Sequence, residues 1–252
     1  MKRITLDTNI WPSILVSQQF SSVREAIRKR TLLACVPETI FTLEAIKKTD
    51  RKGFFANYKP IVSHEETVMS NGAVKISISI GPDKSIHPGN NNKLSECMAE
   101  ALGLGFKVLR CAGRIGGLVN PDLKEAFYME DIFVNIAGRQ KVFLECLKKI
   151  EAKGCGIKQL KDIGAKYDKK FWLDGISLAP QKDWKLISTA VAEWADGDAI
   201  AAHIAYKNEF FCTRDEAKKS GSNSILSEKN KKWLASEYNV KFLNLGQLAT
   251  ML

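Results

Sequence analysis

The sequence RITLDTNIW, at residues 3–11, contains most of the first predicted strand of the chain. Its apolar residues predict a short buried strand over residues 2–7, and this strand ends on the carboxylate of Asp7. Thr8, Asn9 and a large aromatic residue follow at once. An acid at the carboxyl end of a strand either forms a turn or belongs to a ligand site. The remainder of the sequence has to decide between these two roles.

Outward from this stretch, predicted strands alternate with predicted helices. The run TLLACV at residues 31–36 has the length of a strand, and Pro37 is expected to open a helix that holds Glu44 two turns in. Further strands are expected in FKVLRCA at residues 106–112 and in EFFCTRD, which ends on Asp215. The alternation predicts an α/β fold with a mainly parallel central sheet.

Three other segments complete this pattern. Residues 12–30 are expected to form two helical pieces, with Ser21 or Ser22 capping the second. The alternating run GAVKISISI at residues 72–80 predicts a strand. The small-residue run DAIAAHIAYK predicts a helix with Asp198 at its N-terminus. In parallel sheets, ligand sites form outside the carboxyl ends of the strands, where Asp7 is placed.

The bulk composition limits the classes of protein that this chain can belong to. It has 252 residues, 45% of them hydrophobic and 26% charged, which is typical of a folded soluble protein. Its 38 basic and 28 acidic residues give a net charge of +10. This excess favours a polyanionic partner, most often nucleic acid, although a basic surface can also serve solubility alone.

The cysteines and the lengths of the apolar runs indicate the cellular compartment in which the chain is expected. None of the six cysteines is spaced as C-x-x-C and histidine is scarce, so the sequence has no zinc template. Cys35 and Cys212 lie in apolar strand-like runs and are expected to be buried thiols. Without a signal-like start or a run long enough to span a bilayer, the chain is expected in a reducing cytoplasm with no membrane role.

Several acids of the sequence indicate a cation site when they are considered together. Each has a simple structural role available, such as an Asx turn for Asp7 or a helix cap for Asp198, for which Asp196 competes. Glu44, however, lies in the apolar stretch TIFTLEAI, where a charge is costly unless it is paired or bound to a cation. Clustered carboxylates resist ionising together, and a hard divalent cation removes that penalty. A basic surface around such a cluster is what a metal-dependent nuclease requires.

Four motifs carry a resemblance to a known family. In chain order, ITLDTNIW, VPETIFTLEAI, DGDAIAAHIA and FFCTRDEA resemble the PIN-domain nucleases, a PilT N-terminus-like family that includes the VapC toxins. The resemblance implies a three-layer α/β/α fold with a parallel sheet and a cluster of four acids that binds Mg²⁺ or Mn²⁺. The acids that match the family positions are Asp7, Glu44, Asp198 and Asp215. The supporting positions are Asn9, Thr213 and the extra acid Asp196.

The resemblance covers residues 1–48 and 186–252 and leaves the middle unmatched. We therefore expect a single PIN-like domain over residues 1–252, whose core comes from these two segments, with an insertion or elaboration at about residues 49–185. FKVLRCA is the candidate for the remaining core strand. The rest of this segment can build a substrate channel, a lid or a partner surface, so its role stays open.

A basic segment follows the second acid. The run KKTDRKGFFANYK at residues 47–59 mixes aromatic residues with four cations, and such a mixture can track a nucleic-acid strand and stack its bases. These cations are Lys47, Lys48, Arg51 and Lys52. The simpler explanation is a helix end followed by a hydrophobic loop that packs down on the protein.

Competing enzyme classes fit the sequence less well. A haloacid-dehalogenase-type phosphatase needs a second aspartate two residues after the first, where this chain has Asn9. Gly103 and Gly105 precede a strand rather than a helix, which argues against a dinucleotide site, and no Walker-type phosphate loop is present. His203 is expected to be a packing or solvent residue rather than a catalytic base.

Two classes of function remain. The first is a Mg²⁺- or Mn²⁺-dependent endonuclease in which a metal-activated water attacks phosphorus, with RNA favoured over DNA, in a toxin-like, processing or defence role. The second is a catalytically silent module that binds nucleic acid or a partner protein; a structure-specific DNA nuclease is a further alternative. The resemblance also implies an antitoxin or other protein partner and a homodimer as expectations. The presence of all four acids favours the enzyme.

Overall fold

The computed structural model describes residues 1–56, 60–82, 92–111, 123–130, 136–214 and 223–252. At its centre lies a sheet of five strands in the order β5-β2-β1-β6-β7, and every neighbouring pair is parallel. The strands are β1 (Lys2–Leu6), β2 (Leu32–Pro37), β5 (Lys107–Leu109), β6 (Phe210–Cys212) and β7 (Lys241–Leu243). The predicted α/β fold with a parallel sheet is confirmed, and FKVLRCA supplies the edge strand β5.

Helices cover both faces of this sheet because successive strand residues point to opposite sides. Ala34 and Val36 belong to one hydrophobic core and Cys35 to the other. The first core is closed by α1 (Trp11–Val16), α2 (Ser21–Arg28), α4 (Asn92–Leu104) and α10 (Leu245–Met251). The second is closed by α5 (Ile136–Ala152), α8 (Trp184–Ala205) and α9 (Glu228–Tyr238).

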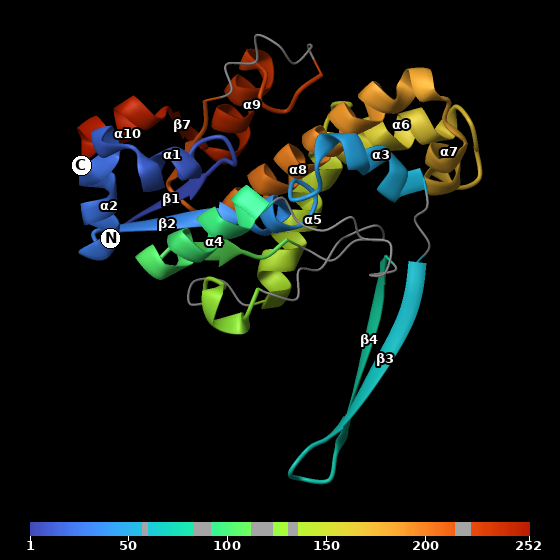
Figure 1. Cartoon of the computed structure of the whole chain (residues 1–252), viewed down its shortest axis with the longest axis horizontal. Helices are drawn as coiled ribbons and strands as arrows, with labels where there is room; N and C mark the ends of the chain where they lie inside the picture. The colour runs from blue at the N-terminus through green and yellow to red at the C-terminus, as the bar shows by residue number, and fades with distance from the viewer. Residues whose placement is uncertain (57–59, 83–91, 112–122, 131–135, 215–222) are drawn as a thin grey trace.

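A third hydrophobic cluster extends the helical layer beyond the sheet (Figure 1). It joins α3 (Lys48–Ala56), α6 (Ile157–Ala165) and α7 (Trp172–Leu178) to the first half of α8. Gly164 of α6 and Gly175 of α7 pack backbone against backbone. A Cβ atom on Gly164 would lie 2.0 Å from the carbonyl oxygen of Trp172, and one on Gly175 would lie 2.0 Å from the carbonyl oxygen of Gly164.

Short 3₁₀ turns make several of the connections. They are η1 (Gln18–Phe20), η2 (Glu38–Phe41), η4 (Glu125–Phe127) and η5 (Gln181–Asp183). The second α-helix, α2, begins directly after η1, so its N-cap is Phe20. The prediction that Ser21 or Ser22 caps this helix is therefore wrong.

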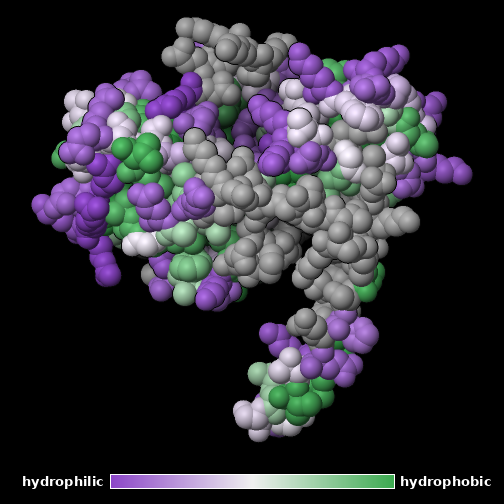
Figure 2. Space-filling model, in the orientation of Figure 1, coloured by the Kyte–Doolittle hydropathy of each residue, from purple (hydrophilic) through white to green (hydrophobic). Residues whose placement is uncertain are grey.

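A long hairpin extends away from the body of the protein (Figure 1). It consists of β3 (Pro60–Val68) and β4 (Val74–Pro82), which pair antiparallel along their whole length. The alternating run at residues 72–80 predicted β4, whereas β3 was not predicted. Figure 2 shows hydrophobic surface near the far end of the hairpin, where Val68, Val74 and Ile76 are exposed.

The helix predicted from Pro37 through the second acid is wrong. The chain forms only the 3₁₀ turn η2, and Thr42 then leaves helical geometry with φ −120° and ψ −85°. The Thr42 hydroxyl donates to the Glu38 carbonyl oxygen at 3.3 Å, and the Glu44 amide reaches back to the Thr39 carbonyl oxygen at 3.0 Å. Glu44 therefore lies in an irregular turn between η2 and α3.

The predicted helix start at Asp198 is also wrong, because α8 is one continuous helix of 22 residues. Gly197 does not interrupt it. A Cβ atom on Gly197 would lie 3.1 Å from the Gly156 Cα atom, so the glycine allows the turn before α6 to approach the helix closely. Asp198 is held in the interior of α8 rather than at a helix end.

A buried polar network lies under β1. Thr5 Oγ1 is 2.8 Å from Nδ1 of His203 on α8, and it accepts a hydrogen bond from Asn208 Nδ2 at 2.9 Å. The His203 ring packs edge-on against Phe211. Burial lowers the pKa of His203 from 6.5 to about 3, so the ring is neutral. His203 is thus a packing residue, as predicted.

The remaining expectations concern thiols and membranes. Cys35 and Cys212 are thiols outside any disulfide, and both are buried as predicted. Burial raises the pKa of each of these two thiols to about 12, which leaves them protonated and poorly nucleophilic. None of the described helices combines the length and the hydrophobicity that crossing a bilayer requires.

The contact between Gly164 and Trp172 predicts a selective loss of stability. We expect Gly164→Ala to lower the free energy of unfolding by about 1–3 kcal/mol or more, because its methyl group overlaps backbone atoms that cannot rotate away. Gly103→Ala is the control, since its Cβ atom meets nothing within 4 Å on α4, and it should be neutral or stabilise by up to about 1 kcal/mol. Urea denaturation measures both, and equal effects would contradict the packing.

The neutral His203 predicts a pH dependence of stability. In the unfolded chain His203 binds a proton near its ordinary pKa of 6.5, whereas in the folded protein it does so only near 3. Its contribution to stability is therefore complete above about pH 6.5 and is lost as the pH falls toward 3. The difference in unfolding free energy between wild type and His203→Gln should shrink from pH 7.5 to pH 5. His64→Gln, on the exposed hairpin, is the control, and a difference that stays constant with pH would contradict the prediction.

Candidate acidic site at the carboxyl edge of the sheet

The carboxyl ends of β1, β2 and β6 meet at one edge of the sheet because the three strands are parallel neighbours. The strand order places β2 on one side of β1 and β6 on the other. Such a reversal leaves a crevice beyond the strand ends, which is where open α/β sheets bind their ligands. Asp7 follows β1 at this position, and Thr213 follows β6.

The carboxylate of Asp7 is buried and held by two donors. Its residue is 6% exposed, and its main-chain amide continues the ladder to β6 by donating to the Cys212 carbonyl oxygen at 3.0 Å. Oδ2 accepts a hydrogen bond from Thr213 Oγ1 at 2.6 Å, and Oδ1 accepts one from the Thr8 amide at 2.7 Å. These contacts fix the orientation of the carboxylate across two strand ends.

A second contact joins the loops that follow β1 and β6. The side-chain oxygen of Asn9 accepts a hydrogen bond from the Arg214 amide at 3.2 Å. The Arg214 guanidinium donates to the Ser13 hydroxyl at 2.9 Å. Asn9 and Thr213, the two polar companions predicted from the sequence, therefore hold the same pair of loops.

Glu44 reaches this edge from the irregular turn after η2. Its carboxylate accepts a hydrogen bond from the Thr8 hydroxyl, so Thr8 links the first and second acids. Burial, and after it the negative charge of Asp7, raise the pKa of Glu44 to about 7, although the Thr8 hydroxyl, Arg51 and Lys48 act in the opposite direction. The two carboxylates lie close enough that they resist carrying charge together.

Arg51 is buried beside the acids rather than exposed for nucleic acid. It is only 4% exposed, and its guanidinium donates to the carbonyl oxygens of Ile46 at 3.1 Å and Ser188 at 3.4 Å. Burial lowers its pKa, while the charges of Glu44 and Asp196 raise it. Arg51 therefore ties α3 to α8 and sets a positive charge next to the acidic edge.

The other predicted cations differ in exposure. Lys47 and Lys48 are exposed at the start of α3, and Lys48 lies near enough to Glu44 to lower its pKa. Lys52 lies in α3, but its side chain is outside the described part of the structure. Of the four, Lys47 and Lys48 are the ones that the structure presents to solvent.

Asp198 is buried on α8, which contacts both β2 and η2. The residue is 4% exposed, and its Oδ2 accepts a hydrogen bond from the Trp194 indole at 3.2 Å. Trp194 in turn packs against Phe55 of α3. Asp196 is half-buried on the same helix, and its negative charge raises the pKa of Arg51.

The structure thus brings Asp7 and Glu44 together through Thr8. Asp215, the fourth predicted acid, lies outside the described residues. Within the described ranges, no group of three or more His, Cys, Asp or Glu side chains has the arrangement of a metal site. The described site is a pair of carboxylates with an arginine beside them, while Asp198 lies on α8 and accepts a hydrogen bond from Trp194.

The sequence did not assign Thr8 to the site, and it assigned Arg51 to nucleic-acid binding rather than to a buried place beside the acids. Thr8 donates through both its amide and its hydroxyl, and its place between Asp7 and Asn9 in LDTN was the available signal. The buried role of Arg51 had no comparable signal, because it lies in the run KKTDRK together with three other cations. Only the fold shows that one cation of this run turns inward.

Comparison with protein-family models, with curated proteins and with solved structures finds no match for this chain.

The pairing of Asp7 with Glu44 predicts a coupled titration. Asp7→Asn should bring the pKa of Glu44 down from about 7 toward its ordinary value of 4.5, although burial will keep it elevated. Carbon-13 NMR of the glutamate side-chain carboxyls measures this shift. In the wild type, the Glu44 contribution to stability is complete below about pH 4.5 and is lost as the pH rises through about 7, since the folded pKa is raised. Asp174→Asn, at an exposed position of α7, is the control, and an unshifted Glu44 in Asp7→Asn would contradict the pairing.

Proposed function

We propose that this chain is a Mg²⁺- or Mn²⁺-dependent endonuclease that hydrolyses phosphodiester bonds, with RNA favoured over DNA. The observation that carries the proposal is the pair of carboxylates of the buried Asp7 and the half-buried Glu44, joined by Thr8 at the carboxyl edge of a parallel sheet. The net charge of +10 supports a polyanionic substrate. The finer assignment to a PIN-like α/β/α fold is part of the same proposal.

The donor chemistry at this edge fits a hard divalent cation. Mg²⁺ and Mn²⁺ prefer carboxylate oxygens, and a cation would replace the proton that the raised pKa holds on Glu44. Asp7 and Glu44 would hold the ion, with Asp198 and Asp215 as the further acids that the family resemblance assigns. When bound, such an ion lowers the pKa of a water and stabilises charge on phosphate oxygens.

The protein's own groups prepare this chemistry. Thr213 and the Thr8 amide fix the orientation of Asp7, so its oxygens need little rearrangement when a ligand arrives. Glu44, with a pKa of about 7, can hold or accept a proton near neutral pH, as a general acid or base must. Lys48 lies exposed beside Glu44 and is placed to meet a phosphate.

The test is cleavage of labelled single-stranded RNA, duplex RNA, single-stranded DNA and branched DNA with Mn²⁺, Mg²⁺ or EDTA. We expect metal-dependent cutting by the wild type, with RNA preferred. Asp7→Asn and Asp198→Asn should each lower the rate by about 100-fold or more, because each removes a charge on which the reaction depends. Asp174→Asn makes the same charge change on α7 and should cut like the wild type.

Binding of the metal gives a second readout that does not depend on activity. Millimolar Mg²⁺ or Mn²⁺ should raise the melting temperature of the wild type, because the ion binds only the folded state. Asp7→Asn should abolish this shift, and circular dichroism confirms that the variant is folded. Metal-dependent cleavage that persists in both Asp7→Asn and Asp198→Asn would contradict the site.

A further inference from the structure

A hollow of about 670 Å³ opens beside the acidic site, at the carboxyl ends of β6 and β7. Its walls come from the end of η1, the first turns of α9 and the start of α10. The volume lies within the range of about 300–1,000 Å³ that small-molecule sites occupy. A single nucleotide is a ligand of suitable size.

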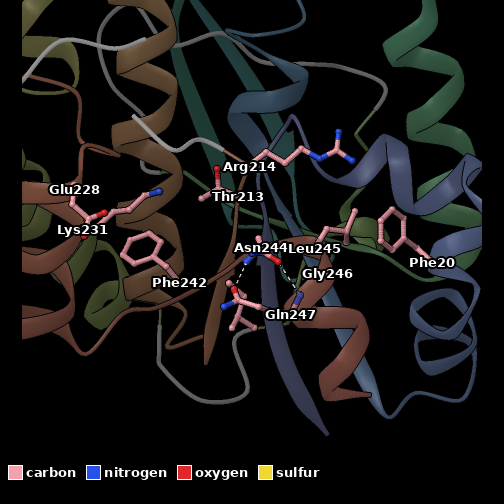
Figure 3. A pocket seen from close by; sticks show the side chains of 11 residues that line it. Phe20, Thr213, Arg214, Glu228, Lys231, Phe242, Asn244, Leu245, Gly246 and Gln247 are labelled. Carbon is pink, nitrogen blue, oxygen red and sulfur yellow. Dashed lines mark hydrogen bonds between the residues drawn. The ribbon is translucent and has the colours of Figure 1, made fainter. Parts of the chain in front are cut away.

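The lining combines aromatic rings with positive charge. Phe20 and Phe242 line the hollow together with Arg214 and Lys231. Figure 3 shows Phe242 and Lys231 on one side, Phe20 on the other, and Thr213 between them. The one acid of the lining, Glu228, pairs on the exposed face of α9 with Lys232. Rings and cations around one space suit a flat base attached to a phosphate.

Phe242 is held in place from the protein interior. Its ring packs edge-on against the buried Phe211 at 5.8 Å, and the Lys231 ammonium lies 5.6 Å from its centroid. The ring is half-buried, so its position is fixed by the core while part of it faces the hollow. A ring fixed in this way loses little freedom when a base stacks on it.

The hollow is continuous with the acidic edge through one residue. Thr213 belongs to the lining of the hollow, and its hydroxyl donates a hydrogen bond to Asp7 Oδ2 at 2.6 Å. Arg214, the next lining residue, is fastened to the β1 loop through Asn9. The hollow therefore adjoins the acidic edge through the residues that follow β6.

We propose that the hollow is the subsite for one unstacked nucleotide of a single-stranded nucleic acid, whose base stacks on Phe242 and whose phosphate meets Lys231 and Arg214. The inference rests on the proposed nuclease function and specifies its substrate as single-stranded. In a duplex each base is stacked on both faces and paired, so it cannot use Phe242 without leaving the helix.

Binding in EDTA tests the subsite apart from any chemistry. Fluorescence anisotropy would compare ten-nucleotide single-stranded RNA, single-stranded DNA, the matching duplexes and a ten-unit abasic DNA strand. We expect both single strands to bind more tightly than the duplexes. Phe242→Leu keeps apolar volume against Phe211 but removes the aromatic face, and it should weaken single-strand binding by about fivefold or more. It should not change binding of the abasic strand, which rules out damage to the fold.

The charge is tested with a matched pair of variants on α9. Lys231→Gln should lower the slope of log affinity against log salt by about 0.7, the value for one phosphate contact on a single strand. Lys229→Gln changes the same charge at an exposed position outside the lining and should leave binding within about twofold of the wild type.

The outcomes separate this inference from the nuclease proposal. Duplex binding as tight as single-strand binding would overturn the subsite, as would wild-type affinity in both Phe242→Leu and Lys231→Gln. Phe242-dependent binding without cleavage after Mn²⁺ is added would support the subsite and overturn the nuclease. Metal-dependent cleavage with no dependence on Phe242 would support the nuclease and overturn the subsite.

Discussion

The hydrogen bond from Thr213 to Asp7 joins two strand ends that are 206 residues apart in sequence. It is possible only because β1 and β6 are parallel neighbours whose carboxyl ends lie at the same edge. The register of that pair sets Thr213 beside Asp7, and the Asn9 contact then fixes the two loops beyond it. The acidic site and the adjoining hollow both depend on this strand pair, because it positions the residues that the proposed function uses.

Buried charge at this edge is balanced by the surrounding elements rather than by solvent. Arg51 donates hydrogen bonds to two backbone carbonyl oxygens, and its positive charge interacts with the negative charges of Glu44 and Asp196. An isolated buried carboxylate would be costly, and a nearby cation with satisfied donors reduces that cost. The raised pKa of Glu44 shows that the compensation is incomplete. A site left in this state favours a cation or a proton, which is the property that the proposed chemistry uses.

Much of the fold could be predicted from the sequence because the strands are short apolar runs bounded by clear turn residues. The predicted strands at residues 2–7, 31–36 and 106–112 correspond to β1, β2 and β5, although β2 extends to Pro37, and their parallel arrangement follows from the intervening helices. The errors have physical causes that a single sequence does not display. Gly197 resembles a break in a helix, yet it allows contact with Gly156, which lies far away in sequence. Pro37 resembles a helix start, yet it ends β2, and the chain after it forms only the short 3₁₀ turn η2.

The site was predictable to the extent that its residues follow strands. Asp7, Asn9 and Thr213 are strand-end residues, and the structure brings them together at one edge. Glu44 depends on an irregular turn, and the inward direction of Arg51 depends on α8 behind it, so neither placement could be derived from local pattern. The hollow lined by Phe242 and Lys231 is assembled from four separate segments, at residue 20 and at residues 213–214, 228–231 and 242–247. Only residues 213–214 belong to a motif that the sequence analysis identified.

The β3–β4 hairpin has a consequence for the behaviour of the protein in concentrated solution. In the described part of the chain each strand pairs only with the other, so the outer side of each presents main-chain donors and acceptors. Val68, Val74 and Ile76 add exposed apolar surface next to these open edges. Such edges are templates for strand addition between molecules, the first step of ordered aggregation. The net charge of +10 opposes that step through repulsion, and salt screens this protection. Colloidal stability in this protein is therefore tied to ionic strength through a segment remote from its acidic site.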